Sequence, residues 1–321
     1  MRRVAYALAA VLAVAAAPSA RAEPLDIDLA KLGAPDPSIW TSISTLPNGP
    51  VLTSTPAQLA KDSRRRFAIL STEMALALSS AVLHPASTTG HSGFAVDLET
   101  ATVAVHPDAV GVAPPLGFTN QVWPTESTQP AQLYMPSVHV RKALPFSLEF
   151  GGRLIYLASS SYFAAQGEGK WALNEGFDLV PDLAVRVAYT RLFGQKDWDL
   201  GATDVDFLVS KRWGVNAVTS FTPYLAARFT YVSASTDRID FAPALSGVDA
   251  NPVGATGTQG AFPRFSAGYY RTTLGVRMTA YAVSLALEGT YFGGATPKVS
   301  GYDDVKIASA FGGAAKLGWE F

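Results

Sequence analysis

The sequence predicts an all-β fold: a transmembrane, antiparallel, up-and-down β-barrel of about ten strands, preceded by one helix. From Gly90 onward, apolar and polar residues alternate with a period of two, which is typical of strands that have one apolar and one polar face. The connections between these strands also sort into short and long ones, as in membrane barrels. In a soluble β-sandwich, we would not expect short and long loops to be separated in this way. Between about eight and fourteen strands are compatible with this pattern.

Residues 1–22 have the features of a cleavable signal peptide. Arg2 and Arg3 give a positive start, an alanine-rich apolar run follows, and Ala20-Arg21-Ala22 is a small-x-small cleavage site. We therefore expect export, with cleavage after Ala22. The chain has no cysteine, which excludes a lipid-modified cysteine anchor, disulfides and thiolate metal ligands.

Composition limits the function classes. Charged residues are 16% of the chain, below the usual quarter, which suits a membrane barrel better than a soluble secreted domain. The net charge of −1 argues against a nucleic-acid partner and against a basic membrane-binding face. After the signal peptide, no run approaches the ~20 apolar residues of a membrane helix.

Residues 23–89 are expected to form an N-terminal segment, extended over 23–54 and then helical. Thr55 is a suitable N-cap, Pro56 suits the first helical position, and the helix should end near Leu83, before a proline. One apolar stripe requires burial. This stripe contains Leu59, Phe67, Leu70, Met74 and Leu78.

The role of this helix is left between a lumen plug and a periplasmic brace. It directly precedes the first strand, so we expect it near the periplasmic mouth of the barrel. In a plug, the consecutive arginines 64–66 would pair with Glu149, Glu168 or Glu288.

Residues 90–321 are expected to form the barrel. Each strand has about the 9–11 residues, or slightly more, that cross a bilayer when tilted. The expected strands are 92–106, 133–142, 145–158, 162–173, 182–193, 203–213, 221–233, 267–279, 283–292 and a terminal strand ending at Phe321.

The terminal strand alternates apolar or small residues with polar ones such as Lys316 and Glu320. Its large apolar residues are Phe311, Leu317, Trp319 and Phe321. This pattern resembles the terminal strand of Gram-negative outer-membrane β-barrel proteins, which closes the barrel and is read by the assembly machinery. The resemblance implies a bacterial outer-membrane location, with outer-membrane lipid and the barrel-assembly machinery as partners.

The polar faces of the strands predict a charged lumen. Positive and negative residues are nearly balanced there, and a small barrel has a lumen that side chains fill, so we expect a ladder of ion pairs. A selective ion path would carry an excess of one sign. The charges expected to face the lumen include Glu149, Arg153, Glu168, Lys170, Arg186, Asp204, Asp206, Arg228, Arg271, Arg277, Glu288 and Lys316.

No enzyme is predicted, and no catalytic, cofactor-binding or metal residue is assigned. Ten-stranded outer-membrane proteases use paired aspartates and a histidine. Here Asp204 and Asp206 are such a pair, but His139 is the one histidine expected in the lumen, and it lies in no matching outer segment. The four histidines show neither metal-ligand spacing nor the Ser–His–Asn arrangement of outer-membrane phospholipases.

The predicted function is a passive channel or a structural outer-membrane component. Two alternatives remain open: a barrel hydrolase of lipid or peptide, and a plugged transporter of hydrophobic compounds. His84-Pro85-Ala86 resembles the Asn-Pro-Ala segment that precedes the barrel in the long-chain fatty-acid and aromatic-hydrocarbon channels. That resemblance implies passage of hydrophobic compounds, although those barrels have more strands.

Overall fold

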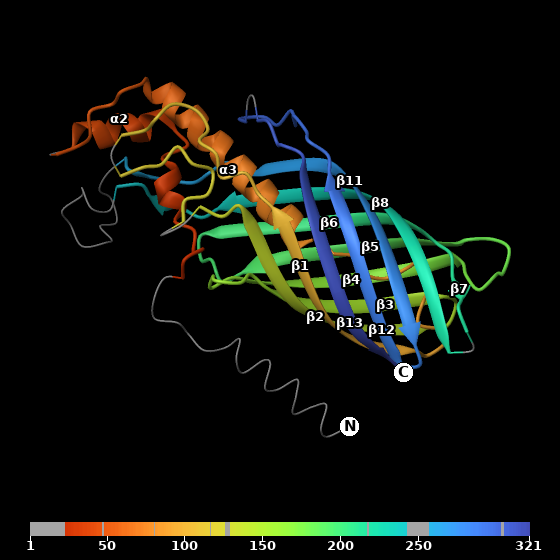
Figure 1. The fold of residues 1–321 in the computed structure, drawn as a ribbon. Coiled ribbons are helices and arrows are strands. Elements are labelled where there is room, and N and C mark those ends of the chain that lie inside the picture. The colour runs from red at the N-terminus through yellow and green to blue at the C-terminus, as the bar shows by residue number, and fades with distance from the viewer. Residues whose placement is uncertain are drawn as a thin grey trace.

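The structure is a computed structural model that describes residues 23–321, apart from 47, 80, 116, 126–128, 217, 243–256 and 303–304. The expected signal peptide lies outside the described residues. Within them, ten antiparallel strands close into one barrel, because β13 pairs with β1 and β11 pairs with β8 (Figure 1). The predicted fold class is confirmed. The barrel strands are β1 (Phe94–Ala104), β2 (Gln132–Leu144), β3 (Leu148–Tyr156), β4 (Phe163–Asn174), β5 (Asp182–Phe193), β6 (Trp198–Ser210), β8 (Thr219–Thr236), β11 (Phe265–Ala280), β12 (Val283–Phe292) and β13 (Ala310–Glu320).

The two ends of the barrel differ in their connections. At one end, which we call the short-turn end, neighbouring strands are joined by 145–147, 175–181, 211–218 and 281–282. The opposite, long-loop end carries 105–131, 237–264 and 293–309, together with the shorter 157–162 and 194–197. Short strands extend two connections: β7 (Trp213–Gly214) pairs with β8, and β9 (Ile239–Asp240) pairs with β10 (Gln259–Gly260).

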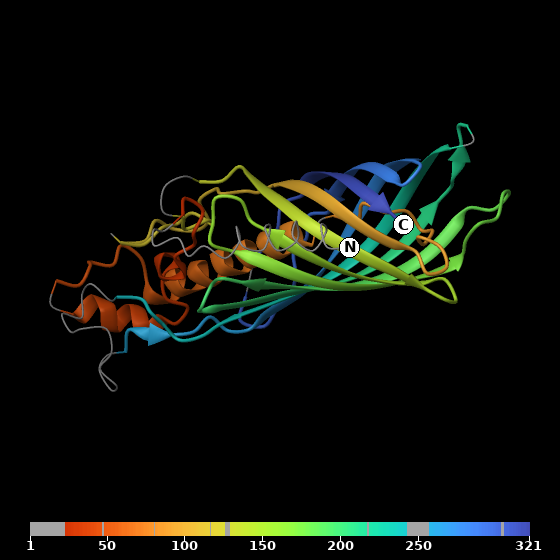
Figure 2. The ribbon, with the colours of Figure 1, turned by 90° about the horizontal axis from the view of Figure 1, so that it is seen from below.

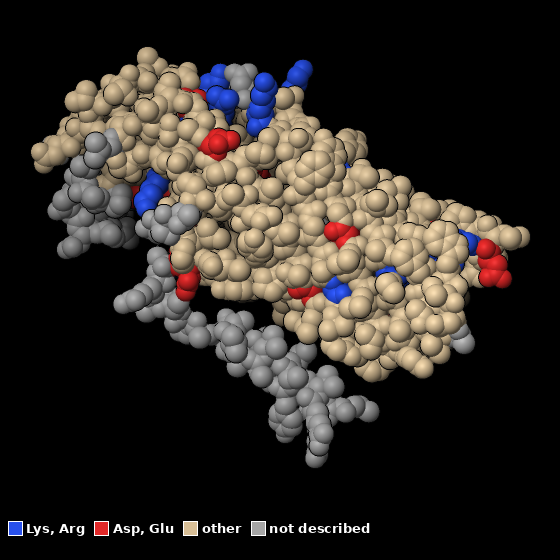
Figure 3. All heavy atoms as spheres, viewed as in Figure 1, with Lys and Arg blue, Asp and Glu red and all other residues tan. Residues whose placement is uncertain are grey.

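The outer face of the barrel is apolar. Each of the ten barrel strands exposes at least one large hydrophobic side chain, and Leu287 and Leu274 at mid-barrel are 63% and 66% exposed. Figure 3 shows that the visible barrel face is mostly uncharged. In the described part of the chain, no helix is both long and apolar enough to span a membrane.

Helical structure precedes the barrel, as η1 (Leu29–Leu32), α2 (Pro37–Thr45) and α3 (Pro56–Leu78). The expectation of an extended segment over 23–54 is therefore wrong, and so is the expectation of a single helix. The carboxylates of Asp28 and Asp36 accept hydrogen bonds from the first turns of η1 and α2, and Pro37 occupies the first position of α2. These capping signals were present in the sequence.

Helix α3 begins where the sequence predicts, with the Thr55 hydroxyl accepting from the backbone N–H of Gln58. It ends at Leu78, five residues earlier than predicted. Leu83 adopts a left-handed φ of 57°, which is incompatible with a continuing helix.

The helices lie at the long-loop end (Figure 2). The expected position at the mouth with the short turns is therefore wrong. We call residues 23–69 the cap. Phe67 stacks on Phe262 with ring centroids 4.4 Å apart, and the Tyr162 hydroxyl lies 2.7 Å from the backbone nitrogen of Ile27. Phe262 and Tyr162 both belong to long-loop-end connections.

Candidate functional site

The barrel lumen contains a cluster of buried charged residues from the strands. The twelve charges listed above as lumen-facing are all buried, with at most 8% of their surface exposed, whereas Arg212, which was also expected inside, is exposed. The apolar residues of β13 point the other way: Phe311 is 69% exposed, and Phe321, just after the strand, is 74% exposed. Because polar and apolar residues alternate along each strand, this division follows from the period of two.

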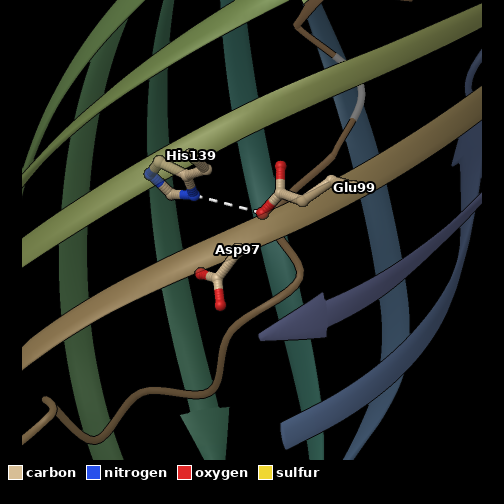
Figure 4. A group of neighbouring side chains, drawn as sticks. All are labelled: Asp97, Glu99 and His139. Carbon is tan, nitrogen blue, oxygen red and sulfur yellow. Dashed lines mark hydrogen bonds and ion pairs between the residues drawn. The ribbon is translucent and has the colours of Figure 1, made fainter. Parts of the chain in front are cut away.

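The lumen is crossed by the chain itself. Residues 79–93, which we call the threaded segment, leave the end of α3 and run through the barrel to the start of β1. Figure 4 shows part of this segment as a coil passing between the strands. Its polar contacts come from lumen side chains of several strands.

Two arginines bind the carboxyl end of α3. The Arg228 guanidinium donates to the Ser79 carbonyl at 2.5 Å, and that of Arg271 donates to the Leu76 and Ser79 carbonyls, each at 3.2 Å. The last carbonyls of a helix lack partners within the helix and carry partial negative charge. The arginines therefore satisfy these carbonyls and complement the helix dipole.

A glutamate holds the middle of the threaded segment. The Glu288 carboxylate accepts hydrogen bonds from the backbone nitrogens of Val82 and Leu83, at 2.8 and 2.7 Å, and from the Tyr224 hydroxyl at 2.9 Å. On the opposite side, Arg153 donates to the Ala81 carbonyl at 2.8 Å. Both backbone donors are buried, and a buried N–H group without a partner is costly.

The segment then reaches the short-turn end. The Ala86 nitrogen donates to the hydroxyl of Ser210, the last residue of β6, at 3.1 Å. The Lys170 ammonium donates to the Ser87 carbonyl at 3.0 Å. The Thr89 nitrogen donates to Glu149 at 2.9 Å, next to the turn that joins β2 and β3.

The carboxylates expected to form a close pair are separated by arginines. Asp206 forms ion pairs with Arg186, at 2.6 Å, and with Arg228, while Asp204 pairs with Arg271 at 2.5 Å. Each of these carboxylates is fully buried. The arrangement consists of cross-strand ion pairs, with no histidine beside either aspartate among the described contacts.

Two histidines lie in the lumen, whereas the sequence reasoning expected only His139. His84 on the threaded segment is also fully buried, and its Nε2 atom lies 3.4 Å from Glu168. His139 contacts the same Glu168 oxygen at 3.3 Å and Glu99 at 3.1 Å. No local pattern predicts that His84 lies in the lumen, because its position depends on the path of the threaded segment.

Asp97, Glu99 and His139 form a compact group in which the ligand atoms lie within 4.8 Å of one another (Figure 4). Three cations already balance its two carboxylates. Asp97 pairs with Arg141 at 2.9 Å and Lys316 at 3.3 Å, and the Arg153 guanidinium lies 2.7 Å from Glu99. A divalent ion would add charge to a site that already has excess positive charge, so we assign this group to the ion-pair network.

The lumen is packed so closely that a Cβ atom at some wall glycines would force neighbouring side chains to shift. A Cβ atom on Gly318 would lie 2.0 Å from an Asp97 carboxylate oxygen, and one on Gly275 would lie 2.2 Å from the Tyr224 ring. Neither Tyr224 nor these glycines were recognised from the sequence. Alternation in a strand shows which way a side chain points, but it does not show what it reaches.

The predicted pairing of arginines 64–66 with lumen glutamates is wrong. Arg65 pairs with Asp62 in its own helix at 3.4 Å, and Arg66 donates to the carbonyls of Leu32 and Val110 at 2.8 and 2.9 Å. These side chains therefore join parts of the cap to each other and, through Val110, join the cap to the connection 105–131. Burial lowers the pKa of Arg66 to about 10, and the nearby Asp62 carboxylate opposes this shift.

The outer face has a hollow of about 730 Å³ across β8, β11, β12, β13, β1 and β2. Its lining includes the outward residues Leu287, Gly289 and Gly313. A Cβ atom on Gly289 would meet nothing within 4 Å, so this glycine is not required by neighbouring atoms. Glu288 lies at the base of the hollow, where the wall consists mainly of small residues.

Comparison with known proteins gives similar structures but no family. No protein-family model and no curated protein matches the chain. Ail, the attachment invasion locus protein of Yersinia pestis, has 12% identity and a TM-score of 0.26, covering 72% of this chain and 100% of its own. Neisserial surface protein A has 14% identity and a TM-score of 0.27, covering 71% and 96%. OmpT, an outer membrane protein of Vibrio cholerae, has 12% identity and a TM-score of 0.25, covering 60% and 56%. Such low scores assign no activity or partner to this chain.

Proposed function

We propose that the protein is an outer-membrane β-barrel whose lumen is kept closed by its own N-terminal segment. It would act as a structural membrane component and not as an open passive channel. The contact that carries this proposal is the Glu288 carboxylate, which holds the backbone of Val82 and Leu83 in the middle of the lumen. The closed barrel and its apolar outer face support a membrane location. Closure gives every strand a hydrogen-bonded neighbour on both sides, so no strand edge is left unpaired in lipid.

The charge distribution supports a closed state. Most lumen cations and carboxylates are paired with each other, so the described residues form no ring of a single sign that would attract one kind of ion. The arginines at the end of α3 hold backbone carbonyls of the segment that occupies the lumen. A permeating solute would therefore have to displace both the segment and its ion pairs.

Single-channel recording in a planar bilayer tests this proposal. The unmodified protein should show no steady conductance. Arg271→Met removes the contacts with Leu76 and Ser79 and should produce transient openings. Arg264→Met on the exposed extension before β11 removes a surface contact with Ser233 and should leave the barrel closed. Steady, ohmic conductance of the unmodified protein would contradict the proposal.

We also propose that the protein is not an enzyme. A hydrolase of the paired-aspartate type needs a histidine close to its carboxylates and a water between them. Here the Asp206 carboxylate is bound by two arginines, and His139 faces glutamates instead. Peptide or lipid hydrolysis by the purified protein, abolished by Asp206→Asn or by His139→Ala, would overturn this view.

The hollow on the outer face favours a second candidate, a plugged transporter of hydrophobic compounds. Its lining is mostly apolar, and it faces the hydrocarbon of the membrane in the proposed location. Gly313→Leu would fill the hollow. Gly167→Leu is a matched control on β4, where a Cβ atom meets nothing within 4 Å, while at Gly313 the nearest atom is 3.8 Å away. A transporter should show weaker binding of a fluorescent fatty acid after Gly313→Leu only, whereas equal binding by both variants would remove this candidate.

A further inference from the structure

We propose that the chain crosses the membrane inside its own barrel, so that the cap is displayed at the outer surface while β1 begins at the periplasmic side. The barrel would thus carry its own N-terminal residues outward. This inference rests on the outer-membrane location proposed above. It goes further by fixing the side on which residues 23–69 lie and the route by which they are connected to the barrel.

The first observation is the position of the cap. Phe67 packs against Phe262 and lies 6.5 Å, between ring centroids, from Trp198 at the start of β6. Just beyond the cap, the Glu73 carboxylate accepts from the Trp123 indole at 2.7 Å and from the His106 ring at 3.1 Å. All four partners belong to the long-loop end, so the cap and the following turns of α3 are fixed there.

The second observation is the order of contacts along the chain. Leu76 and Ser79 contact Arg271, which pairs with Phe292, the residue at the long-loop end of β12. Leu83 contacts Glu288 at mid-strand, and Ala86 contacts the last residue of β6. Gly93 finally accepts a hydrogen bond from the Ala143 backbone at 2.9 Å, beside the short turn after β2. The contacts therefore descend from one end of the barrel to the other without reversal.

The third step is the direction of the barrel in the membrane. Outer-membrane barrels have short turns on the periplasmic side and long loops outside. The long-loop end, which carries the cap, is then external, and the start of β1 is periplasmic. This placement reverses the expectation from sequence, which put the N-terminal helix on the periplasmic side because it directly precedes the first strand.

The lumen is the route that the polar backbone of the segment can take. Along the lipid face, each unpaired N–H or C=O group would cost several kcal/mol, by the estimate of about 2–7 kcal/mol for a buried amide. Inside, the carbonyl of Ala81 and the nitrogens of Val82 and Leu83 all have partners. Because β1 and β13 close the wall, the barrel must form around the segment or admit it from one end.

Single-cysteine labelling tests the placement, and the chain suits it because it has no cysteine of its own. Thr41→Cys reports the cap, where Thr41 is exposed on α2. Ala282→Cys reports the short turn between β11 and β12, where Ala282 is also exposed. A maleimide attached to a polymer too large to pass through a barrel lumen is added to intact cells and to cells with a permeabilised outer membrane. Gel mobility before and after heating shows that each variant has folded.

We expect Thr41→Cys to be labelled on intact cells. Ala282→Cys should be unlabelled on intact cells and labelled on permeabilised cells. Labelling of Ala282→Cys on intact cells, with Thr41→Cys protected, would place the cap in the periplasm and overturn the inference. The result is independent of whether the lumen conducts, so conductance of the purified protein would contradict the proposed closure while leaving the sidedness to be decided by labelling.

Discussion

Replacing Glu288 by leucine should destabilise the folded barrel and loosen the threaded segment. The carboxylate is 8% exposed and accepts from three donors, the nitrogens of Val82 and Leu83 and the hydroxyl of Tyr224. A buried donor left without a partner costs about 1–3 kcal/mol. Three such donors give a loss of about 3–4 kcal/mol in unfolding free energy, near the low end of the sum because water can reach part of the emptied space.

The assay is urea unfolding of the detergent-folded protein, followed by heat-dependent gel mobility, with bilayer recording on the same samples. Glu288→Gln keeps one acceptor oxygen and should lose about half as much stability. Thr290→Val is the control, because Thr290 also points inward from β12 but bonds only the Thr273 hydroxyl, at 2.8 Å, among the described residues. It should cost about 1 kcal/mol and leave the lumen closed.

Equal stability of Glu288→Leu and Thr290→Val, with no conductance from either variant in the bilayer, would contradict this role of Glu288. That outcome would mean that the segment is held by its packing and not by hydrogen bonds to its backbone. A loss of stability without any conductance would show that the Glu288 contacts stabilise the barrel but do not keep the lumen closed. The two readouts therefore separate the strength of the contact from its role.

Three further predictions concern the wall and the cap. Leu287→Arg at mid-strand should cost about 2–4 kcal/mol in vesicles and Val283→Arg at the strand end about 0–1 kcal/mol; equal costs in urea unfolding would refute the proposed depth. Gly313→Ala should stabilise the barrel by about 0.5–1 kcal/mol, since no atom lies closer than 3.8 Å to the new Cβ. Gly318→Ala, which would press on Asp97, should destabilise it by about 1–3 kcal/mol, and the reverse order would contradict the close packing. The hydrogen bond with Glu73 raises the pKa of His106 above 6.5, so this contact should stabilise the cap below about pH 6.5 and weaken as pH rises through the raised value. Protease protection of the cap should follow that trend and lose it in His106→Gln.

The barrel was predictable because its physical signals are local. Alternation of residues such as Leu287 and Glu288 fixes both the strand and the direction of each side chain. The lengths of the connections then fix the two ends. The strand boundaries predicted in this way lie within five residues of the observed ones. The twelve charges listed as lumen-facing are buried. The early end of α3 was missed because nothing in the residues around Leu83 shows that the chain must extend there to cross a lumen.

The position of the N-terminal helix was not predictable, because adjacency in sequence was taken as adjacency in space. Fifteen residues, 79–93, separate the end of α3 from β1. An extended chain spans up to about 3.3 Å per residue, so this number is enough to cross a bilayer core of about 30 Å. A linker of that length allows α3 to lie at either end of the barrel. The contacts of Phe67 and Glu73 place it at the long-loop end.

The barrel binds the threaded segment mainly through the backbone of the segment. This explains why the residues of the segment do not predict its position in the lumen. Arg153 and Arg228 bind carbonyl oxygens, and Glu288 binds two backbone nitrogens. Every residue other than proline offers these same groups, so such recognition leaves no motif in the residues that are bound. The specificity lies in the strands, where charged side chains stand at fixed positions along the lumen. Mutations of the wall should therefore open the barrel more readily than mutations of the segment that fills it.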